Sequence, residues 1–177
     1  MIACDGGWGG IKLEDGAEII MLNSTLKNAF TAIESEGGKI LIENSLANRS
    51  IIPSIYNCRR GIDVVAGSFS DSIKFKYAYF KNDAPLSYYD KGLDFFVRLE
   101  DVDDTPTKFI SCKFENSHFT SGTERAAGVL GMRSGMHFVK GGSTTTTYSN
   151  PGTQQSCVVP NDPPNEFHGL KKGIWAH

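Results

Sequence analysis

Four acidic side chains lie close together in the chain, and carboxylates in this pattern could support two kinds of chemistry. They are Glu100, Asp101, Asp103 and Asp104. Carboxylates at alternate positions can share a hard cation such as Ca²⁺, which prefers oxygen ligands. Two carboxylates can also act as general acid and general base in the hydrolysis of a glycosidic bond. The segment comes just before a predicted strand, so a solvated acidic turn is the more ordinary interpretation.

Two pairs of adjacent aromatic residues follow one another at Tyr88, Tyr89, Phe95 and Phe96. An exposed aromatic ring offers a flat apolar surface on which a sugar ring can stack, but the same rings also pack in cores. On a strand, one member of an adjacent pair points inward and the other outward. The outward members, with Tyr88 and Tyr89 as the candidates, are therefore possible ligand contacts.

The adjacent pair Arg59 and Arg60 is the basic counterpart of these candidates. An arginine fork could neutralise the carboxylate of an acidic ligand. Lys74 and Lys76 alternate with aromatic residues, a pattern that indicates the solvent face of a strand. His137 alternates with a phenylalanine in the same way.

No other familiar catalytic or metal-binding pattern is present. The histidines are scattered and no glycine-rich phosphate loop occurs. The cysteines Cys4, Cys58, Cys112 and Cys157 show no CxxC spacing, so a zinc site has no support. Four separate thiols are the simplest interpretation, and one disulfide that includes Cys157 is the alternative.

Length and composition predict a single globular domain over residues 1–177. The chain is 40% hydrophobic, which is enough for a core, and its formal net charge of −2 gives no reason to expect nucleic acid as a partner. No apolar run approaches the ~20 residues of a membrane span, so membrane insertion is not expected. Glycine and β-branched residues are frequent and helical periodicity is missing, which predicts a protein made mostly of strands.

A short pattern recurs along the chain: an apolar residue, one intervening residue, then Asn or Gly. The apolar positions are Leu26, Leu46, Phe80, Phe114 and Phe167. In several copies a second apolar residue follows after a small residue, as in Ala32-Ile33 and Gly173-Ile174. Asparagine tolerates the left-handed backbone of a sharp bend better than other residues with a side chain. We therefore expect Asn23 and Asn44 to turn the chain at equivalent bends.

A repeat of about 20 residues with this pattern resembles one coil of a right-handed parallel β-helix, the pectate-lyase-like solenoid family. The resemblance implies an all-β fold in which inward side chains stack in columns and asparagines form ladders between coils. It also implies an outer face on which enzymes of this kind place acidic residues, Ca²⁺ and basic residues. An antiparallel sandwich with ordinary hairpin turns is the alternative fold.

Intervals longer than one coil predict insertions near residues 83–107 and 140–164, the second rich in Gly, Ser, Thr and Pro. Neither end of the sequence shows a cap, which predicts a fragment of a longer protein or self-association at the coil ends.

Taken together, these features favour a structural or binding module of a secreted or cell-surface bacterial protein, such as an adhesin, with carbohydrate as a ligand. Two alternatives stay open. One is a polysaccharide lyase or glycoside hydrolase that uses Asp101, Asp103 and Asp104, and the other is a phage tailspike that recognises surface glycans.

Overall fold

The computed structural model describes residues 7–44, 52–65, 73–84, 92–102, 107–118, 127–139, 143–150, 153–160, 164–170 and 172–176. Eighteen strands and no helix lie in these ranges. They therefore contain no helix that is long and apolar enough to cross a membrane.

Five successive coils of three strands each account for most of the chain. The first is β1 (Ile11–Leu13), β2 (Glu18–Leu22) and β3 (Thr25–Lys27). The second is β4 (Thr31–Ser35), β5 (Lys39–Glu43) and β6 (Ser54–Tyr56). The third is β7 (Arg60–Val65), β8 (Lys74–Lys76) and β9 (Tyr79–Asn82). The fourth is β10 (Phe95–Glu100), β11 (Thr107–Ile110) and β12 (Lys113–Asn116). The fifth is β13 (Ala127–Met132), β14 (Met136–Val139) and β17 (Glu166–His168), after which β18 (Lys172–Ala176) begins another coil.

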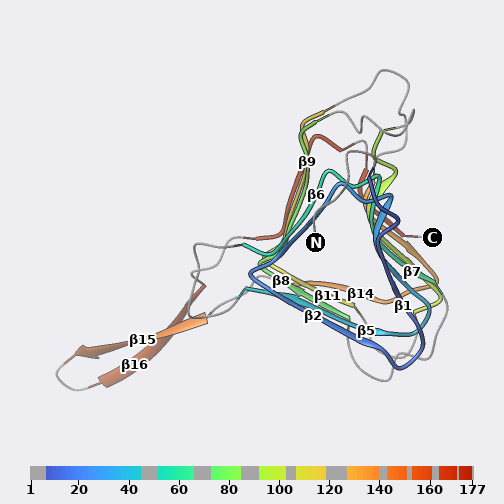
Figure 1. The fold of residues 1–177 in the computed structure, drawn as a ribbon. Coiled ribbons are helices and arrows are strands. Elements are labelled where there is room, and N and C mark those ends of the chain that lie inside the picture. The colour runs from blue at the N-terminus through green and yellow to red at the C-terminus, as the bar shows by residue number, and fades with distance from the viewer. Residues whose placement is uncertain are drawn as a thin grey trace.

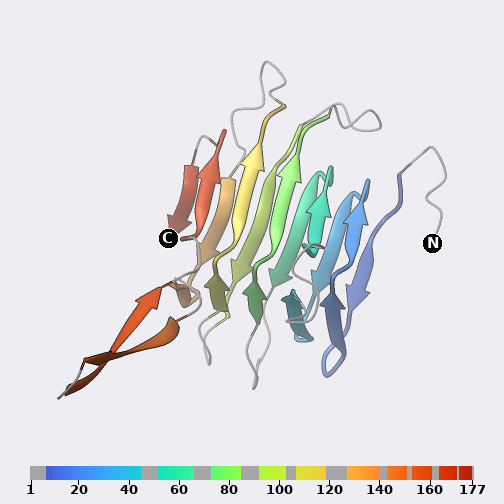
Figure 2. The same ribbon diagram turned by 90° about the vertical axis from the view of Figure 1, so that its left-hand side faces the viewer.

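Equivalent strands of successive coils pair in parallel and form three sheets around a triangular interior (Figure 1). Sheet 1 has the order β1-β4-β7-β10-β13-β18, sheet 2 has the order β2-β5-β8-β11-β14, and sheet 3 has the order β3-β6-β9-β12-β17. Seen from the side, the strands follow their chain order from one end of the stack to the other (Figure 2). The prediction of a parallel β-helix solenoid is confirmed.

The register shows which parts of the predicted repeat are right. Equivalent positions in sheet 1 are held by Ile11, Ile33, Ile62, Val97, Val129 and Ile174. In sheet 3 the column is Leu26, Ile55, Phe80, Phe114 and Phe167. Four of the five expected anchors in sheet 3 are therefore correct. The second anchor is Ile55 rather than Leu46, which lies outside the described residues.

The asparagines of the repeat serve two different purposes. Asn23 and Asn28 have positive φ angles of 51° and 59°, as expected for residues that turn the chain. Asn44 was expected to do the same, but it is buried and is not among the positive-φ residues. Asn82 and Asn116 are also buried, and the Asn82 Nδ2 donates to the Asn116 Oδ1 at 2.9 Å. That contact is one rung of the expected ladder between coils.

The core changes character along the solenoid. In the first coils it consists of aliphatic and small side chains, and from the third coil onward phenylalanines stack in two adjoining columns. In sheet 3, Phe114 stacks on Phe80 and on Phe167 with ring centroids 4.8 Å apart in both cases. In sheet 2, Phe109 stacks on Phe138 at 4.7 Å. These distances match the ~4.8 Å spacing of paired strands, so in-register pairing itself brings the rings into contact.

The two predicted insertions have different outcomes. Residues 95–100, expected inside the first insertion, form β10 in the middle of sheet 1. In the second, β15 (Ser143–Asn150) and β16 (Thr153–Pro160) pair as an antiparallel hairpin that projects from a corner of the triangle (Figures 1 and 2). The chain re-enters the solenoid at Asn165, whose Oδ1 accepts from the Cys112 backbone N–H at 2.8 Å.

Candidate functional site

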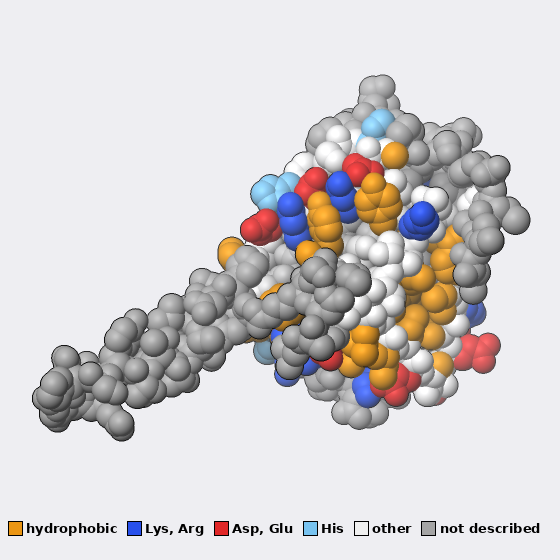
Figure 3. Space-filling view, turned by 60° about the vertical axis from the view of Figure 1, so that its left-hand side comes forward, with side chains coloured by type: hydrophobic (Ala, Val, Ile, Leu, Met, Phe, Trp, Pro, Cys, Tyr) orange, Lys and Arg blue, Asp and Glu red, His pale blue; other side chains and the backbone are white. Residues whose placement is uncertain are grey.

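The outer face of sheet 3 carries an ordered set of tyrosine, lysine and acidic side chains, which form one band in Figure 3. They are outward because their neighbours in the strands, Ile55, Phe80 and Phe114, point into the core. We call this set the tyrosine face, and its members are Tyr56, Tyr79, Lys81, Asp83, Lys113 and Glu115.

Tyr56 of β6 is held by Asp83, which directly follows β9 in the next coil. The Tyr56 hydroxyl donates to the Asp83 Oδ1 at 2.5 Å, and the Lys81 Nζ lies 2.7 Å from the Asp83 Oδ2. The Asn57 side chain also binds Asp83, donating to Oδ1 and accepting from the backbone N–H. Hydrogen bonds from Lys81 and Tyr56 lower the pKa of the Asp83 carboxyl, and the bond to Asp83 raises the pKa of Tyr56.

Tyr79 of β9 repeats this arrangement one coil further on. Its hydroxyl donates to the Glu115 Oε2 at 2.7 Å, and the Lys113 Nζ lies 2.9 Å from the same oxygen. The Lys113 ammonium also lies 5.2 Å from the centre of the Tyr79 ring. Burial, followed by the bond to Glu115, raises the pKa of Tyr79, while Lys113 lowers the pKa of Glu115.

The two tyrosines are half-buried and lie diagonally on neighbouring strands. Ser54 pairs with Tyr79 in the parallel register, so Tyr56 lies two residues further along the neighbouring strand, about 8 Å from Tyr79 between Cα atoms. Each ring is fixed at its hydroxyl and covered on one side by the lysine of the next coil. The result is a pair of oriented aromatic rings on a flat, polar face.

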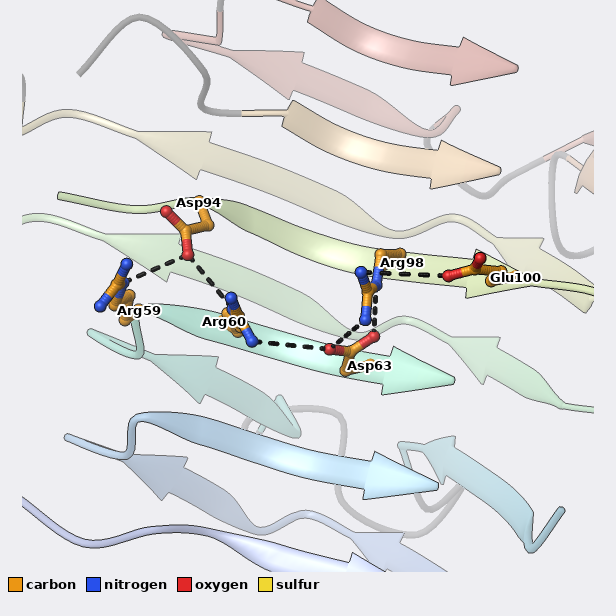
Figure 4. A network of polar contacts seen from close by, with 6 residues as sticks. All are labelled: Arg59, Arg60, Asp63, Asp94, Arg98 and Glu100. Atoms are coloured by element: carbon orange, nitrogen blue, oxygen red, sulfur yellow. Dashed lines mark hydrogen bonds and ion pairs between the residues drawn. The ribbon is translucent and has the colours of Figure 1, made fainter. Parts of the chain in front are cut away.

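Arg59 and Arg60 lie on a different face, the outside of sheet 1, where they converge on Asp94 (Figure 4). Asp94 immediately precedes β10, and its backbone N–H bonds the Arg59 carbonyl at 2.9 Å. Both arginine Nε atoms lie 3.2 Å from the same oxygen, the Asp94 Oδ2. One carboxylate oxygen thus serves two guanidinium groups.

Aromatic rings support these guanidinium groups from the neighbouring coils. The Arg59 guanidinium lies 4.9 Å from the centre of the Phe30 ring, and that of Arg60 lies 5.4 Å from the same ring. Arg60 also lies over Phe95 at 5.8 Å. Phe95 is the outward member of its pair, but only 6% of its surface is exposed, so it is not a platform for a sugar ring. Phe96 is in the core against Phe80 and Phe114.

The rest of the network in Figure 4 centres on Arg98, and it is linked to the first part through the Arg60 Nη1, which lies 4.0 Å from the Asp63 Oδ2. The Arg98 Nε and Nη2 donate to the two carboxylate oxygens of Asp63 at 2.6 and 2.9 Å. Asp63 is 5% exposed at its side chain, while Glu100 lies 4.0 Å from Arg98. The network of Figure 4 therefore joins three arginines to three acids, and its charges cancel.

The acidic segment is only partly described. Asp101 forms a bidentate ion pair with Arg133 of the next coil, and this pairing lowers the pKa of the Asp101 carboxyl. Asp103, Asp104, Tyr88 and Tyr89 lie outside the described residues. Within the described part of the chain, no group of three or more His, Cys, Asp and Glu residues is arranged to hold a metal ion.

The remaining predictions concern residues outside these clusters. Lys74 and Lys76 lie on the outer face of β8, with Phe75 fully buried between them, and His137 is exposed on β14. Cys58 and Cys112 are buried and unpaired, and burial raises the pKa of their thiols to about 11 and about 12. Both are poor nucleophiles at neutral pH, because the thiolate is the reactive form.

The predicted repeat did not reveal the tyrosine face, because its anchor in the second coil was Leu46 rather than Ile55. With Ile55 as the anchor, Tyr56 follows directly and must point outward, as Tyr79 does before Phe80. The charge pattern Tyr-x-Lys-x-Asp in residues 79–83 was a second signal for this face.

Comparison with protein-family models, curated proteins and solved structures finds no match to this chain. The resemblance to the pectate-lyase-like repeat family stays a prediction.

Proposed function

We propose that this chain is a binding module whose tyrosine face holds a carbohydrate chain. The observation that carries the proposal is the pair Tyr56 and Tyr79, two partly exposed rings on one sheet that are fixed through their hydroxyls. Fixed aromatic rings lose little conformational entropy when a ligand stacks on them. The surrounding ammonium and carboxylate groups can exchange hydrogen bonds with sugar hydroxyls.

The charges of this face favour a largely neutral glycan. Lys81 and Lys113 are each paired with a carboxylate, Asp83 and Glu115, so the four charges cancel. A strongly anionic ligand would have to displace these carboxylates. An extended glycan crossing the strands diagonally, from Tyr56 to Tyr79, needs no displacement. A location at the cell surface or outside the cell stays the prediction that fits such a ligand.

Hydrolysis or lyase chemistry on this face is less well supported. A general acid must carry a proton near neutral pH, yet the pKa values of Asp83 and Glu115 are lowered by their lysine neighbours. Asp101 is held in its charged form by Arg133 in the same way. These carboxylates are suited to ordering neighbouring side chains rather than to proton transfer.

Affinity electrophoresis in gels containing soluble polysaccharides tests the proposal. The wild-type protein should be retarded by at least one neutral glycan, and Tyr56→Ala with Tyr79→Ala together should weaken that binding by about tenfold or more. Tyr79→Phe keeps the ring and should retain most of the binding.

His137→Ala is the matched control, because it removes an exposed ring from sheet 2. Circular dichroism confirms that each variant is folded. Equal retardation of the wild type and the folded double variant, or no retardation by any glycan of a broad panel, would contradict the proposal.

A further inference from the structure

We propose that the hairpin of β15 and β16 is a self-association site, through which two copies of this chain join by pairing their β15 strands edge to edge. The hairpin stands away from the three sheets of the solenoid (Figures 1 and 2). It uses neither the outer face of sheet 3 nor that of sheet 1. The proposal is therefore independent of the carbohydrate proposal.

Both strands of the hairpin are long, and each has an open edge. They have eight residues each and pair over their whole length, from Ser143 opposite Pro160 to Asn150 opposite Thr153. Among the described strands, no third one joins this sheet. A sheet of two strands is at best marginally stable in water, and three or more strands are normally needed. The hairpin therefore gains stability when another strand is added to it.

The features that normally protect an open strand edge are missing from this hairpin. Soluble proteins block such edges with charged residues, proline, a bulge or very short strands. Residues 141–160 contain no charged side chain, and β15 contains no proline. The described pairing of the two strands is continuous, so no bulge interrupts it. An edge of this kind can accept a further strand through main-chain hydrogen bonds.

The register shows which residues of β15 turn their backbone groups to the open edge. A loop of two residues closes on a hydrogen-bonded pair, which here is Asn150 and Thr153. Hydrogen-bonded and non-hydrogen-bonded pairs then alternate along the hairpin. On β16 the outward set ends in Pro160, which has no N–H to donate. On β15 the outward set is complete, and it consists of Ser143, Thr145, Thr147 and Ser149.

The sequence of β15 is complementary to itself. When two β15 strands run antiparallel about a two-fold axis at Thr146, the outward positions lie opposite one another. Thr145 then pairs with Thr147 of the second copy, and the outward serines pair with each other. Between these positions, Thr144 lies opposite Tyr148 of the second copy. Thr–Thr and aromatic–β-branched pairs both stabilise antiparallel strands, so this register is favourable along its length.

These properties favour a second copy over a different protein. An uncharged edge offers no electrostatic complementarity to a foreign partner. In the two-fold register, by contrast, every residue from 143 to 149 carries a hydroxyl group and lies opposite another such residue. Antiparallel pairing also places the two solenoids at opposite ends of a four-stranded sheet. Each strand spans about 26 Å, so the contact is made away from the stacked coils.

The expected dimer is weak and reversible. One pair of edge strands buries less surface than a stable protein interface normally does. We therefore expect dissociation constants in the micromolar range. The two-fold contact closes on itself, so association stops at the dimer as long as the β16 edge stays unpaired.

Sedimentation equilibrium of the full chain at several concentrations tests the proposal, with a reducing agent present to prevent disulfides through Cys157. The wild type should show a monomer–dimer equilibrium. Thr147→Pro removes an outward N–H that the hairpin itself does not use, and it should weaken the dimer by about tenfold or more. Ser156→Pro is the matched control, because Ser156 lies opposite Thr147 and its N–H is at the other edge. It should leave the equilibrium unchanged.

Exchange of charges between two variants tests the register. Thr145→Lys with Thr147→Lys places lysines opposite lysines in the dimer, and Thr145→Glu with Thr147→Glu places glutamates opposite glutamates. Like charges directly opposite one another destabilise strand pairing, so each double variant alone should be monomeric. A mixture of the two should form a heterodimer, because opposite charges then lie opposite one another.

Four results would overturn the proposal, provided that circular dichroism shows each variant to be folded. They are a wild type that is monomeric at every concentration, a dimer that Thr147→Pro leaves intact, a dimer that Ser156→Pro weakens as much as Thr147→Pro does, and a mixture of the charged variants that stays monomeric. A dimer that persists in Thr147→Pro would place the association elsewhere, such as at the ends of the stack.

Discussion

The polar contacts of single side chains in this protein are made more with the adjacent coil than with neighbours in sequence. Asp83 shows this clearly, since it holds Tyr56 and Asn57 of the preceding coil and Lys81 of its own. Asp101 and Arg133 are a second example across one strand spacing. Charged side chains on the outside therefore act as connections between coils.

The pH dependence of stability should report the contact of Asp83. Its folded pKa is lowered, so the stabilisation is fully present above the unfolded value near 4 and is lost as pH falls through the folded pKa. Asp83→Asn should therefore lower the melting temperature at pH 7. The corresponding loss in the free energy of unfolding is about 1 kcal/mol or less. The difference in melting temperature between the variant and the wild type should shrink as the pH falls from 4 to 2. Thermal melts across this range measure it, with the exposed Glu34→Gln as the matched control.

At the scale of the strand, several coils place a glycine in sheet 1 where the backbone of the next coil leaves no room for a side chain. These glycines are Gly10, Gly61 and Gly128, each one position before the apolar anchor of its coil, whereas Ala32 and Phe96 hold the same position in two other coils. A Cβ atom at Gly61 would lie 2.2 Å from the Phe96 carbonyl oxygen, and one at Gly128 would lie 2.4 Å from the Gly173 carbonyl oxygen. Glycine is required at these two positions because the backbone of the next coil occupies the space of a side chain.

Gly61→Ala should consequently destabilise the protein by about 1–3 kcal/mol, because the atom in the way is backbone within a paired strand. Gly9→Ala is the matched control, since a Cβ atom there meets nothing within 4 Å. It should change the free energy of unfolding by about 0.5 kcal/mol or less. Urea denaturation of both variants measures the difference. Equal transition midpoints would show that the sheet can open at Gly61 without cost.

The contrast between these columns and the surface sites explains what could be predicted from the sequence. Ile33 and Ile174 each follow a bend by the same number of residues, because the geometry of a bend depends only on nearby residues. Such positions were enough to predict the fold class. The pairing of Arg59 with Asp94 depends on the length of the third coil, 35 residues from Ile62 to Val97. Coil length varies from 22 residues (11 to 33) to 45 (129 to 174). The sequence alone therefore could not place surface residues of neighbouring coils together.

At the scale of the molecule, the stack is well packed in the middle and less so at its ends. Ile62 and Val97 are fully buried, whereas Ile174 in the same column is 47% exposed. The phenylalanine columns follow the same trend, since Phe109 and Phe114 are fully buried while Phe138 and Phe167 are only partly buried. Because each coil contacts only its neighbours, an end strand is paired on one side alone in the described structure.

This arrangement predicts that local opening proceeds from the ends. Separating β18 from β13 breaks one parallel pairing, whereas freeing β7 breaks its pairing with both β4 and β10 and exposes a fully buried core. In hydrogen exchange at low protein concentration, the slowest amides of β7 and β10 should be the most protected. Those of β1 and β18 should be the least protected, and they should open at free energies well below that of global unfolding. Mass spectrometry of peptic fragments measures this gradient. Uniform protection from β1 to β18 would instead show that all coils open together, which requires contacts at the ends as strong as those between Phe80, Phe114 and Phe167.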